Sequence, residues 1–467
     1  MWGSANPSYS PHLWSPLKPK RRASSKLRPR CNPEASRFNA MKTVLLAAGK
    51  GTRLYPLTET RPKSLIPLLG KPLLSYTINA LEELHLNDFT IVVDKGKKEN
   101  FQKALSDYVK PESKFTYVEQ EAPKGTAHAM STVKDLLTLG PILLIYGDII
   151  LESSVIERVL HVHENCKLNL MVAVESTTQS RDLGIVKFKG HRLINIVEKP
   201  RLRSETSYVN AGVYVFEDDF YPFIDDLNPS PRGEYELTDS INKYVASGGT
   251  VSVVKAEDDE WMHIGYPWDV LDANKRILKG MESRVEGELE DHTSVKGTVV
   301  MREGAVLKAG SVVEGPVYIG EGATVGPNCF IRPYTAIGRG VKVGHGCEIK
   351  NSVVMNGSKI SHLSYIGDSI IGENCNIGAG TITANLRFDE LNIKMRVKDD
   401  YVDTGRKKLG AVIGDRVKTG IHVCLMPGVK IGCDSIIGPN SLIDKDIPSR
   451  KFVAARCEVN AMDLKPR

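Results

Sequence analysis

Residues 41–63 read MKTVLLAAGKGTRLYPLTETRPK, and the amino-terminal half of the chain is organised around this stretch. Thr43–Leu46 is a short apolar run that predicts a buried first strand. Two glycines follow in the string AAGKG, and they allow the backbone to turn tightly and bring its N–H groups up to a phosphate chain. Arg53 and Lys63 add a planar guanidinium and a point charge, both of which suit phosphate oxygens. The stretch therefore predicts a strand that leads into a phosphate-binding loop.

A glycine-rich loop alone identifies no family. The dinucleotide-binding fingerprint needs a third glycine that is missing here, and no Gly-Lys-Ser/Thr closes the loop as in a P-loop. A generic tight connection would explain the glycines but not the whole string AAGKGTRLYPLTETRPK. This string resembles the signature of the sugar-1-phosphate nucleotidylyltransferases, and the resemblance implies catalytic roles for Arg53 and Lys63. It also implies a nucleotide-binding loop made of Ala47, Ala48, Gly49, Gly51 and Thr52.

Composition and charge exclude several classes of protein. The 467 residues are 41% hydrophobic and 25% charged, as in a globular chain of two or three domains, and no apolar run approaches the ~18 residues of a membrane span. The net charge of +6 is localised, because residues 1–40 carry eight Lys/Arg and one acid, which leaves −1 for the remainder. We therefore expect neither a nucleic-acid nor a membrane partner. The eight cysteines form no C-x-x-C pair and no metal-binding spacing, which fits a reducing cytoplasm.

Residues 1–40 form a basic tail rich in serine and proline, without an apolar segment long enough for a signal peptide. A disordered arm or a transit peptide fits this composition, although the prolines disfavour the amphipathic helix of a transit peptide. In the family that the signature resembles, the strand before the glycine loop normally begins the chain, and Met41 stands two residues before it. We therefore expect Met41 to be the true start, and residues 1–40 to be an over-extended reading frame.

Residues 41–280 alternate between strand and helix patterns. Apolar runs at Phe89–Val93 and Ile142–Ile145 predict buried parallel strands, and the amphipathic Leu73–Leu84 predicts a crossover helix. The sheet is expected to continue through Leu168–Val174 and Val209–Phe216. This order predicts a Rossmann-like, doubly wound α/β domain in which ligands sit beyond the carboxyl ends of the strands, where the glycine loop lies.

The resemblance to nucleotidylyltransferases extends beyond the loop. Gln120, Gly125 and Thr126 match the segment that reads the base, with Gln120 on the pyrimidine edge. Asp148 follows a buried strand in Tyr146-Gly147-Asp148, and the resemblance implies that it is the Mg²⁺ ligand. The implied sugar pocket consists of Gly184, Glu198, Lys199 and Asn210, with Lys199 on the sugar phosphate.

One position departs from the family pattern. The family usually shows W-x-D-x-G near the end of this domain, with the aspartate as second metal ligand, but here the string is Trp261-Met262-His263-Ile264-Gly265. Mg²⁺ prefers hard oxygen ligands, so His263 is a poor substitute. Three alternatives follow: Asp148 works with substrate phosphates and water alone, the metal is bound weakly, or a softer ion is used.

After a charged linker at residues 281–292, the pattern changes to a six-residue period. Large apolar residues recur every six positions from Val295 to Met355 and again from Ile413 to Ile443, where only Thr419 interrupts them, and a small or β-branched residue stands two positions before nearly all of them. This pattern predicts a parallel β-helix, in which large and small inward residues fill a narrow triangular prism. It resembles the left-handed kind and covers residues 293–455, with a tail at 456–467.

The period breaks between Met355 and Ile360 and again between Ile366 and Ile371, where the spacing is five. His362-Leu363-Ser364-Tyr365 lies between the breaks, and sites that break a strict local rule are often functional. Later, Leu386–Leu409 leaves the prism, and loops of this length are usually functional or mobile. In a trimeric β-helix such an arm typically reaches the neighbouring subunit, and we expect a homotrimer.

Acyl transfer to an amine needs a base, and histidine is the usual choice near neutral pH. His362 in HLSYIGD and the later string NIGAGTITAN at 376–385 resemble the acetyltransferase half of the bifunctional glucosamine-1-phosphate acetyltransferase/N-acetylglucosamine-1-phosphate uridyltransferases, in their archaeal form. The resemblance implies that His362 is the general base. It assigns the sugar phosphate to Arg332 and Lys350, the sugar to Tyr365 and Asn376, and acetyl-CoA to Ala379 and Asn385. Lys394, Arg450 and Lys451 are further candidates for the phosphates of coenzyme A.

The sequence thus predicts a cytoplasmic, trimeric two-domain enzyme. It would acetylate glucosamine-1-phosphate with acetyl-CoA and then, with Mg²⁺, transfer a uridylyl group from UTP to N-acetylglucosamine-1-phosphate, making UDP-N-acetylglucosamine. One rival is a monofunctional nucleotidylyltransferase that uses glucose- or mannose-1-phosphate with dTTP, UTP or GTP, and whose β-helix is a scaffold; His362 and Asn376 argue against it. A second rival is a non-enzymatic regulatory protein, and Arg53, Lys63 and Asp148 argue against that.

Overall fold

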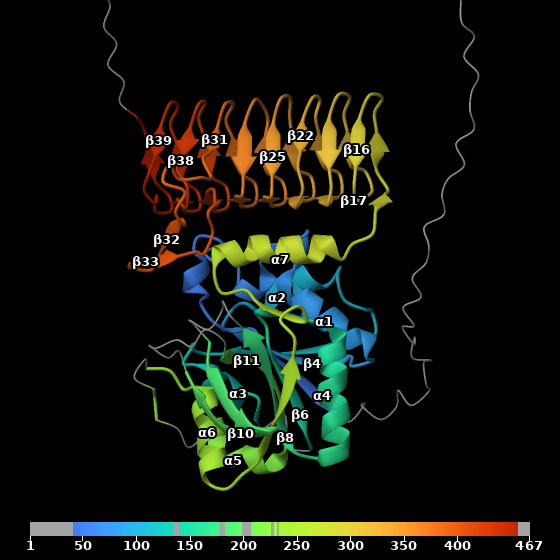
Figure 1. Cartoon of the computed structure of the whole chain (residues 1–467), viewed down its shortest axis with the longest axis vertical. Coiled ribbons are helices and arrows are strands. Elements are labelled where there is room, and N and C mark those ends of the chain that lie inside the picture. The colour runs from blue at the N-terminus through green and yellow to red at the C-terminus, as the bar shows by residue number, and fades with distance from the viewer. Residues whose placement is uncertain are drawn as a thin grey trace, which may run out of the picture. The chain divides into compact units, whose positions relative to one another are not determined.

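The computed structural model describes residues 41–134, 140–176, 183–198, 207–225, 228–230 and 233–455. The predicted tails at 1–40 and 456–467 lie outside the described residues. An α/β domain is followed by a β-helix, as predicted (Figure 1). In the part of the chain that is described, no helix is both long and apolar enough to cross a membrane.

A nine-stranded mixed sheet, in the order β5-β4-β1-β6-β11-β8-β12-β10-β9, forms the centre of the α/β domain. Its strands are β1 (Lys42–Leu46), β4 (Asp88–Asp94), β5 (Lys114–Gln120), β6 (Ile142–Tyr146), β8 (Asn169–Ser176), β9 (Ile185–Lys189), β10 (Arg192–Val197), β11 (Ser207–Phe216) and β12 (Val251–Ala256). β1 pairs in parallel with β4 on one side and with β6 on the other. The strand order therefore reverses at β1, and the loop that follows β1 opens at the switch point of the sheet.

Helices and short strands surround this sheet. The helices are α1 (Leu73–Glu83), α2 (Lys98–Leu105), α3 (Thr126–Ser131), α4 (Ser153–Cys166), α5 (Pro222–Asp225), α6 (Leu237–Ala246) and α7 (Pro267–Lys279). The short strands are β2 (Pro67–Leu68), β3 (Lys71–Pro72), β7 (Ile149–Leu151) and β13 (Trp261–His263). The predicted strands at 89–93 and 142–145 and the predicted crossover helix at 73–84 are confirmed to within a residue or two at each end, because each buries the apolar face that the sequence marked.

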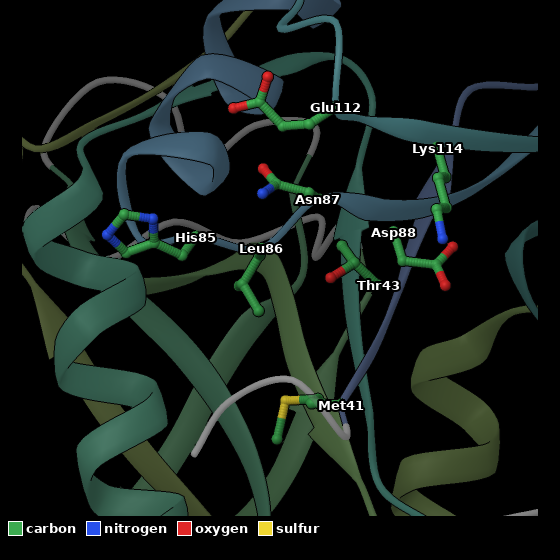
Figure 2. A pocket seen from close by; sticks show the side chains of 8 residues that line it. All are labelled: Met41, Thr43, His85, Leu86, Asn87, Asp88, Glu112 and Lys114. Carbon is green, nitrogen blue, oxygen red and sulfur yellow. The ribbon is translucent and has the colours of Figure 1, made fainter. Parts of the chain in front are cut away.

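A small cavity of about 160 Å³ lies at the amino ends of β1, β4 and β5 (Figure 2). Thr43, Asn87 and Lys114 are among the residues that line it. Ligands of doubly wound sheets bind at the carboxyl ends of the strands, so this cavity lies at the opposite edge from the glycine loop.

Three parallel sheets build the β-helix, an arrangement consistent with the predicted left-handed form. The first sheet contains β14 (Arg284–Val285), β17 (Val299–Met301), β20 (Val317–Ile319), β23 (Thr335–Ile337), β26 (Val353–Val354), β29 (Ile370–Ile371), β34 (Val412–Ile413) and β37 (Lys430–Ile431). The second sheet contains β15 (Glu288–Leu289), β18 (Val306–Leu307), β21 (Thr324–Val325), β24 (Lys342–Val343), β27 (Lys359–Ile360), β30 (Asn376–Ile377), β35 (Lys418–Thr419), β38 (Ile436–Ile437) and β40 (Phe452–Val453). The third sheet contains β16 (Ser294–Lys296), β19 (Val312–Glu314), β22 (Phe330–Ile331), β25 (Glu348–Lys350), β28 (Tyr365–Gly367), β31 (Ile382–Thr383), β36 (Cys424–Leu425) and β39 (Leu442–Ile443).

The predicted linker at 281–292 differs from the structure. β14 and β15 lie inside it and pair in parallel with β17 and β18 of the next coil. Most of this segment is therefore the first coil of the β-helix. Its strands are exposed because no earlier coil covers them, and this exposure explains the charged sequence.

The first break in the period also falls earlier than predicted. Val354, not Met355, pairs with Ile337 and is buried in the core of the β-helix. Met355 faces outward, yet it is buried because it packs against the α/β domain, where its Sδ accepts a hydrogen bond from Arg61 at 3.4 Å. The second break, before Ile371, is where the sequence placed it.

One buried cluster joins the first sheet to the α/β domain. Its members from the first sheet include Ala336, Val353, Ile370 and Val412, and those from the α/β domain include Leu54, Leu68, Trp268 and Leu271. The predicted arm at 386–409 also enters this cluster. It folds into the hairpin β32 (Lys394–Val397) and β33 (Asp400–Asp403), and Met395 and Val397 are buried in the cluster. The hairpin therefore packs on its own chain, and contact of the arm with a neighbouring subunit stays a prediction.

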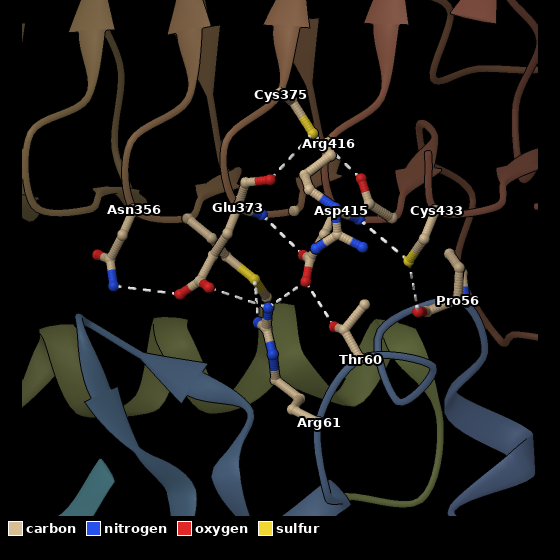
Figure 3. Close-up of polar contacts among 12 residues, drawn as sticks. Pro56, Thr60, Arg61, Asn356, Glu373, Cys375, Asp415, Arg416 and Cys433 are labelled. Atoms are coloured by element: carbon tan, nitrogen blue, oxygen red, sulfur yellow. Dashed lines mark hydrogen bonds and ion pairs between the residues drawn. The ribbon is translucent and has the colours of Figure 1, made fainter. Parts of the chain in front are cut away.

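Polar contacts flank this cluster at the turns that lead from the first sheet to the second (Figure 3). Arg61 stands near the end of the signature stretch, three residues after Thr58. It forms ion pairs with Asp415 and, at 3.1 Å, with Glu373. Thr60 donates a hydrogen bond to Asp415 at 2.5 Å. The end of the signature stretch thus joins the two domains.

Arg61→Ala is expected to lower the free energy of unfolding by about 3 kcal/mol, because it leaves the buried Asp415 carboxylate without its counter-charge. Urea denaturation followed by tryptophan fluorescence measures the loss. Arg416→Ala is the matched control, since Arg416 pairs with Asp434 at 2.6 Å on the surface and is expected to change stability by less than about 1 kcal/mol. Equal losses in the two variants would contradict the anchoring role of Arg61.

Candidate active sites

A cavity of about 630 Å³ opens at the carboxyl ends of β1 and β6. Every residue that the sequence assigned to nucleotide binding and nucleotidyl transfer lines it: Ala47, Ala48, Gly49, Gly51, Thr52, Arg53, Lys63, Gln120, Gly125, Thr126 and Asp148. The lining residues that were not predicted include Lys50, Tyr146, Glu234 and Lys398. We call this space the nucleotide cavity.

The glycine loop after β1 is held by both conformation and hydrogen bonds. Gly51 has a φ of 58°, and a Cβ there would lie only 3.0 Å from Cγ2 of Thr58, so the turn requires glycine. The N–H of Gly49 donates to both carboxylate oxygens of Asp94 at 3.1 Å. Asp94 was not predicted from the sequence. Its position directly after the apolar run Phe89–Val93, at the functional edge of the sheet, was the available signal.

Lys63, Asp148 and His263 meet on one side of the nucleotide cavity. The Lys63 Nζ lies 2.5 Å from Asp148 Oδ2, and the His263 Nε2 lies 3.3 Å from the same oxygen and 3.3 Å from Nζ. β13 pairs antiparallel with β7 so that His263 is opposite Ile149, and this pairing places the imidazole beside Asp148.

Burial and charge tune these three groups. Burial alone would raise the pKa of Asp148, but the Lys63 ammonium and the His263 imidazole hold it well below its usual range. Burial lowers the pKa of Lys63, and the Asp148 carboxylate opposes that shift. Burial, followed by the Lys63 charge, lowers the pKa of His263, so its imidazole is neutral near pH 7.

Asp148 can also hold a cation. Its Oδ2 faces Lys63, whereas its Oδ1 is buried and has no hydrogen-bond partner among the residues that the structure describes. A buried carboxylate oxygen of this kind fits a ligand position of a divalent cation. His263 would add a neutral imidazole nitrogen, a donor that suits Mn²⁺, Co²⁺ or Zn²⁺ better than Mg²⁺.

Gln120 is fixed at another side of the cavity. Its Nε2 lies 2.7 Å from His128 Nδ1 and 3.5 Å from the carbonyl oxygen of Gly125. Burial lowers the pKa of His128, so Nδ1 can accept a hydrogen bond from the amide. Gly125 has a φ of 117°, and a Cβ there would lie 2.4 Å from the carbonyl oxygen of Tyr235, so this close crossing requires glycine.

The predicted sugar residues lie next to the nucleotide cavity but do not line it. Asn210 donates its N–H to the Gly184 carbonyl at 2.8 Å, and a Cβ on Gly184 would meet Glu198 Oε2 at 2.6 Å, so these three residues are neighbours. The amide of Asn210 bonds the hydroxyl of Tyr214, which lies 3.4 Å from the hydroxyl of Tyr146 in the cavity wall. Lys199 lies outside the described residues.

Three of the predicted acetyl-transfer residues project from the third sheet of the β-helix. Arg332 NH1 lies 2.8 Å from Glu348 Oε1, and Lys350 Nζ lies 3.0 Å from Asp368 Oδ2. Tyr365 is in register with Glu348. Parallel pairing of successive coils therefore stacks these side chains on one face.

Asp368 is the node of this face. Its Oδ2 also accepts a hydrogen bond from Asn385 Nδ2 at 2.5 Å, and the same Nδ2 donates to the Tyr365 hydroxyl at 3.2 Å. Asp368 stands at the end of the string HLSYIGD, but no role was predicted for it. A carboxylate that ends this string was the signal.

His362 lies at the corner between the second and third sheets, in the turn between β27 and β28, and it is exposed. Ala379 lies at the same corner one coil later, and Asn376 projects from the second sheet. Arg450 lies at a different corner, where the chain turns from the first sheet to the second. One chain therefore does not gather Asn376 and Arg450 with Lys350, because each third of a coil turns to another face of the prism.

Comparisons with known proteins identify the family. A family model described as nucleotidyl transferase matches residues 42–280, and one described as GMPPB C-terminal domain matches residues 313–426. The chain is 46% identical over 421 residues to "Bifunctional protein GlmU" of Methanococcus maripaludis strain C7, covering 90% of this chain and 98% of that protein. "Bifunctional protein GlmU" of Methanocaldococcus jannaschii is 43% identical, covering 91% and 100%.

A third relative carries a more descriptive name. "Bifunctional sugar-1-phosphate nucleotidylyltransferase/acetyltransferase" of Sulfurisphaera tokodaii is 40% identical over 415 residues, covering 88% of this chain and 99% of that protein. The similarity thus spans both domains and almost the whole length of each relative. The chain belongs to the nucleotidyl transferase family and, within it, to the bifunctional sugar-1-phosphate nucleotidylyltransferase/acetyltransferases.

Proposed function

We propose that this enzyme acetylates glucosamine-1-phosphate with acetyl-CoA and then transfers a uridylyl group from UTP to the N-acetylglucosamine-1-phosphate so formed. The product is UDP-N-acetylglucosamine. The observation that carries the proposal is the nucleotide cavity, in which the glycine loop, Gln120, Lys63 and Asp148 face one space. The names of the full-length relatives support the presence of both activities.

In uridylyl transfer, an oxygen of the sugar phosphate attacks the α-phosphorus of UTP, and pyrophosphate leaves with the electron pair of the broken bond. The reaction depends mainly on positioning and charge stabilisation. The N–H groups of the loop and the Arg53 guanidinium, which lies 5.3 Å from the ring centroid of Tyr266, hold the phosphates. Lys63 lies beside Asp148, and its positive charge stabilises the negative charge that develops on the phosphates during the reaction. Mg²⁺ bound at Asp148 Oδ1 would supply Lewis-acid polarisation of the α-phosphate.

In acetyl transfer, the amine of glucosamine-1-phosphate attacks the thioester carbonyl carbon of acetyl-CoA, and coenzyme A leaves as the thiolate. His362 takes the proton that the amine loses. Arg332 and Lys350 bind the sugar phosphate, and Asp368 positions Lys350 and Asn385 through its two contacts. Asn376 orients the sugar, and Ala379, Asn385 and Arg450 contact acetyl-CoA.

We propose that the β-helices assemble into a homotrimer that completes the acetyl-transfer sites. The corner that carries His362 also exposes Leu363 by 62% and Ile421 by 52%, and Leu442 on the third sheet is 65% exposed. Apolar side chains gathered on one side of a β-helix require a covering surface, and a second copy supplies it. Light scattering of the full chain should give three times the mass of one chain, and a monomeric mass would contradict this assembly.

A cytoplasmic location is part of the proposal. The six cysteines that the structure describes, namely 166, 329, 347, 375, 424 and 433, are all free. Free thiols fit a reducing compartment.

The experiment that tests the proposed function uses the wild-type chain and two product assays. Glucosamine-1-phosphate with acetyl-CoA should release coenzyme A, and N-acetylglucosamine-1-phosphate with UTP and Mg²⁺ should release pyrophosphate. Pyrophosphate release without coenzyme A release would favour the monofunctional nucleotidylyltransferase. Release of neither product would contradict both enzymatic functions.

His263→Asp is expected to shift the metal preference of uridylyl transfer toward Mg²⁺. The substitution replaces a nitrogen donor 3.3 Å from Asp148 by a carboxylate, which Mg²⁺ prefers. The ratio of the activity with Mg²⁺ to that with Mn²⁺ should rise by about tenfold, the size of effect that groups next to the ligands of a metal have on its affinity. His128→Asn, which leaves the metal region intact, serves as the control; an unchanged ratio in the His263 variant would show that His263 lies outside the coordination sphere.

A further inference from the structure

The β-helix domain contributes a side chain to the nucleotide cavity of the other domain. Lys398, at the tip of the β32–β33 hairpin, lines the cavity together with Lys50 and Thr52 of the glycine loop. The hairpin begins more than 240 residues after Gly147, which stands next to Asp148 of the nucleotide cavity. No pattern in either half of the sequence links the hairpin to this cavity.

A second cavity of about 570 Å³ adjoins the first and shares Lys50, Thr52 and Lys398 with it. Its wall carries four cationic side chains and two carboxylates: Lys50, Arg396, Lys398 and Lys430, against Glu59 and Asp446. Lys430 pairs with Asp446 at 3.3 Å. The remaining wall is net positive, and this charge favours an anion.

The hairpin tip is held in place. Met395 and Val397 are buried in the cluster shared by the two domains, so Arg396 projects from the opposite face of the strand, and Lys398 is exposed in the turn that follows. The Nζ of Lys430 donates to the Arg396 carbonyl and lies 5.6 Å from the ring centroid of Tyr55, which follows the glycine loop. The strand that carries Arg396 therefore has a fixed position relative to the loop.

The backbone at the tip is unusual. Lys398 has a φ of 56°, a conformation that glycine or asparagine adopts more cheaply than lysine. Val397 pairs with Asp400, so Lys398 and Asp399 form a two-residue turn.

We infer that Lys398 and Arg396 bind the pyrophosphate group, as the β- and γ-phosphates of the bound nucleotide and as the leaving product, in the second cavity. This inference rests on the proposed uridylyl transfer. A polyphosphate held by the glycine loop meets the second cavity at Lys50 and Lys398, because these residues belong to both spaces. The β-helix domain then completes the nucleotide site of the α/β domain in the same chain.

Calorimetric titration of the full chain tests this inference with three ligands: inorganic pyrophosphate, UTP and UMP. Lys398→Gly is the variant of choice, because glycine accepts the turn conformation and keeps the hairpin. Loss of one charged contact should weaken pyrophosphate and UTP binding by about tenfold and leave UMP unchanged, since UMP lacks the terminal phosphates. Lys398→Arg should retain most of the affinity. Lys407→Ala, an exposed lysine on the returning arm, is the control and should bind all three ligands as the wild type does.

The outcomes distinguish failure of the proposed pyrophosphate subsite from failure of the proposed uridylyl transfer. Unchanged affinity for pyrophosphate and UTP in Lys398→Gly would overturn the inference, and so would equal weakening for UMP. Weakened binding of UTP but not of pyrophosphate would assign Lys398 to the bound nucleotide alone and overturn the leaving-product role. If the wild type releases no pyrophosphate from UTP, the proposed function fails, yet the titrations still report on the subsite.

Discussion

Asp148→Asn is expected to lower the rate of uridylyl transfer by about 10²–10³-fold, the usual effect of removing one electrostatic group from a preorganised site. The amide keeps the shape of the carboxylate but loses the charge that faces Lys63 at 2.5 Å and weakens the buried Oδ1 as a cation ligand. Pyrophosphate release under saturating UTP measures the effect.

Acetyl transfer by the same preparation is the internal control for Asp148→Asn and should not change. Asp434→Asn removes a half-exposed carboxylate that pairs with Arg416 on the β-helix, and it should leave both activities within about twofold of the wild type. If Asp148→Asn retained a tenth or more of the uridylyl transfer, Asp148 would lie outside the reaction centre.

His362→Ala is expected to lower acetyl transfer by about 10²–10⁴-fold, the usual contribution of a positioned general base. Uridylyl transfer should remain, because His362 lies at the corner opposite the first sheet, which is the sheet that packs on the α/β domain. Coenzyme A release, measured with a thiol reagent, gives the rate.

His345 provides a matched control for this substitution. It is exposed in the equivalent turn one coil earlier, and its carbonyl accepts the N–H of Leu363. His345→Ala should retain acetyl transfer, and an equal loss would indicate a general disturbance of this corner. Full activity in His362→Ala would reduce the β-helix to a scaffold and favour the monofunctional rival.

The repetitive parts of the fold were predictable because they are local. Val313, Ile331 and Ile349 are each buried by the coil to which they belong and by its neighbours, so a six-residue spacing is sufficient to identify them. The prediction failed at Met355 because the α/β domain, and not the core of the β-helix, buries this residue. The sequence pattern records that a residue is apolar but not which partner covers it.

The candidate nucleotide site was predictable from motifs, but the residues outside the motifs that hold or extend it were not. Arg53, Lys63 and Asp148 stand in strings that resemble the nucleotidylyltransferase signature, and all three line one cavity. Asp94 and Lys398 stand in no such string, and their positions depend on strand pairing and on the docking of the hairpin. Residues of this second kind become visible only when the chain is folded.

The cluster that contains Leu68, Trp268, Val353 and Met395 has a consequence for how the two activities are inherited. Each domain supplies one side of this cluster. If the gene were divided between the two domains, each polypeptide would expose an apolar face to water. The two domains are therefore expected to lose solubility when they are expressed separately. The two catalysts are synthesised in equal numbers and degraded together, and their stoichiometry needs no transcriptional control.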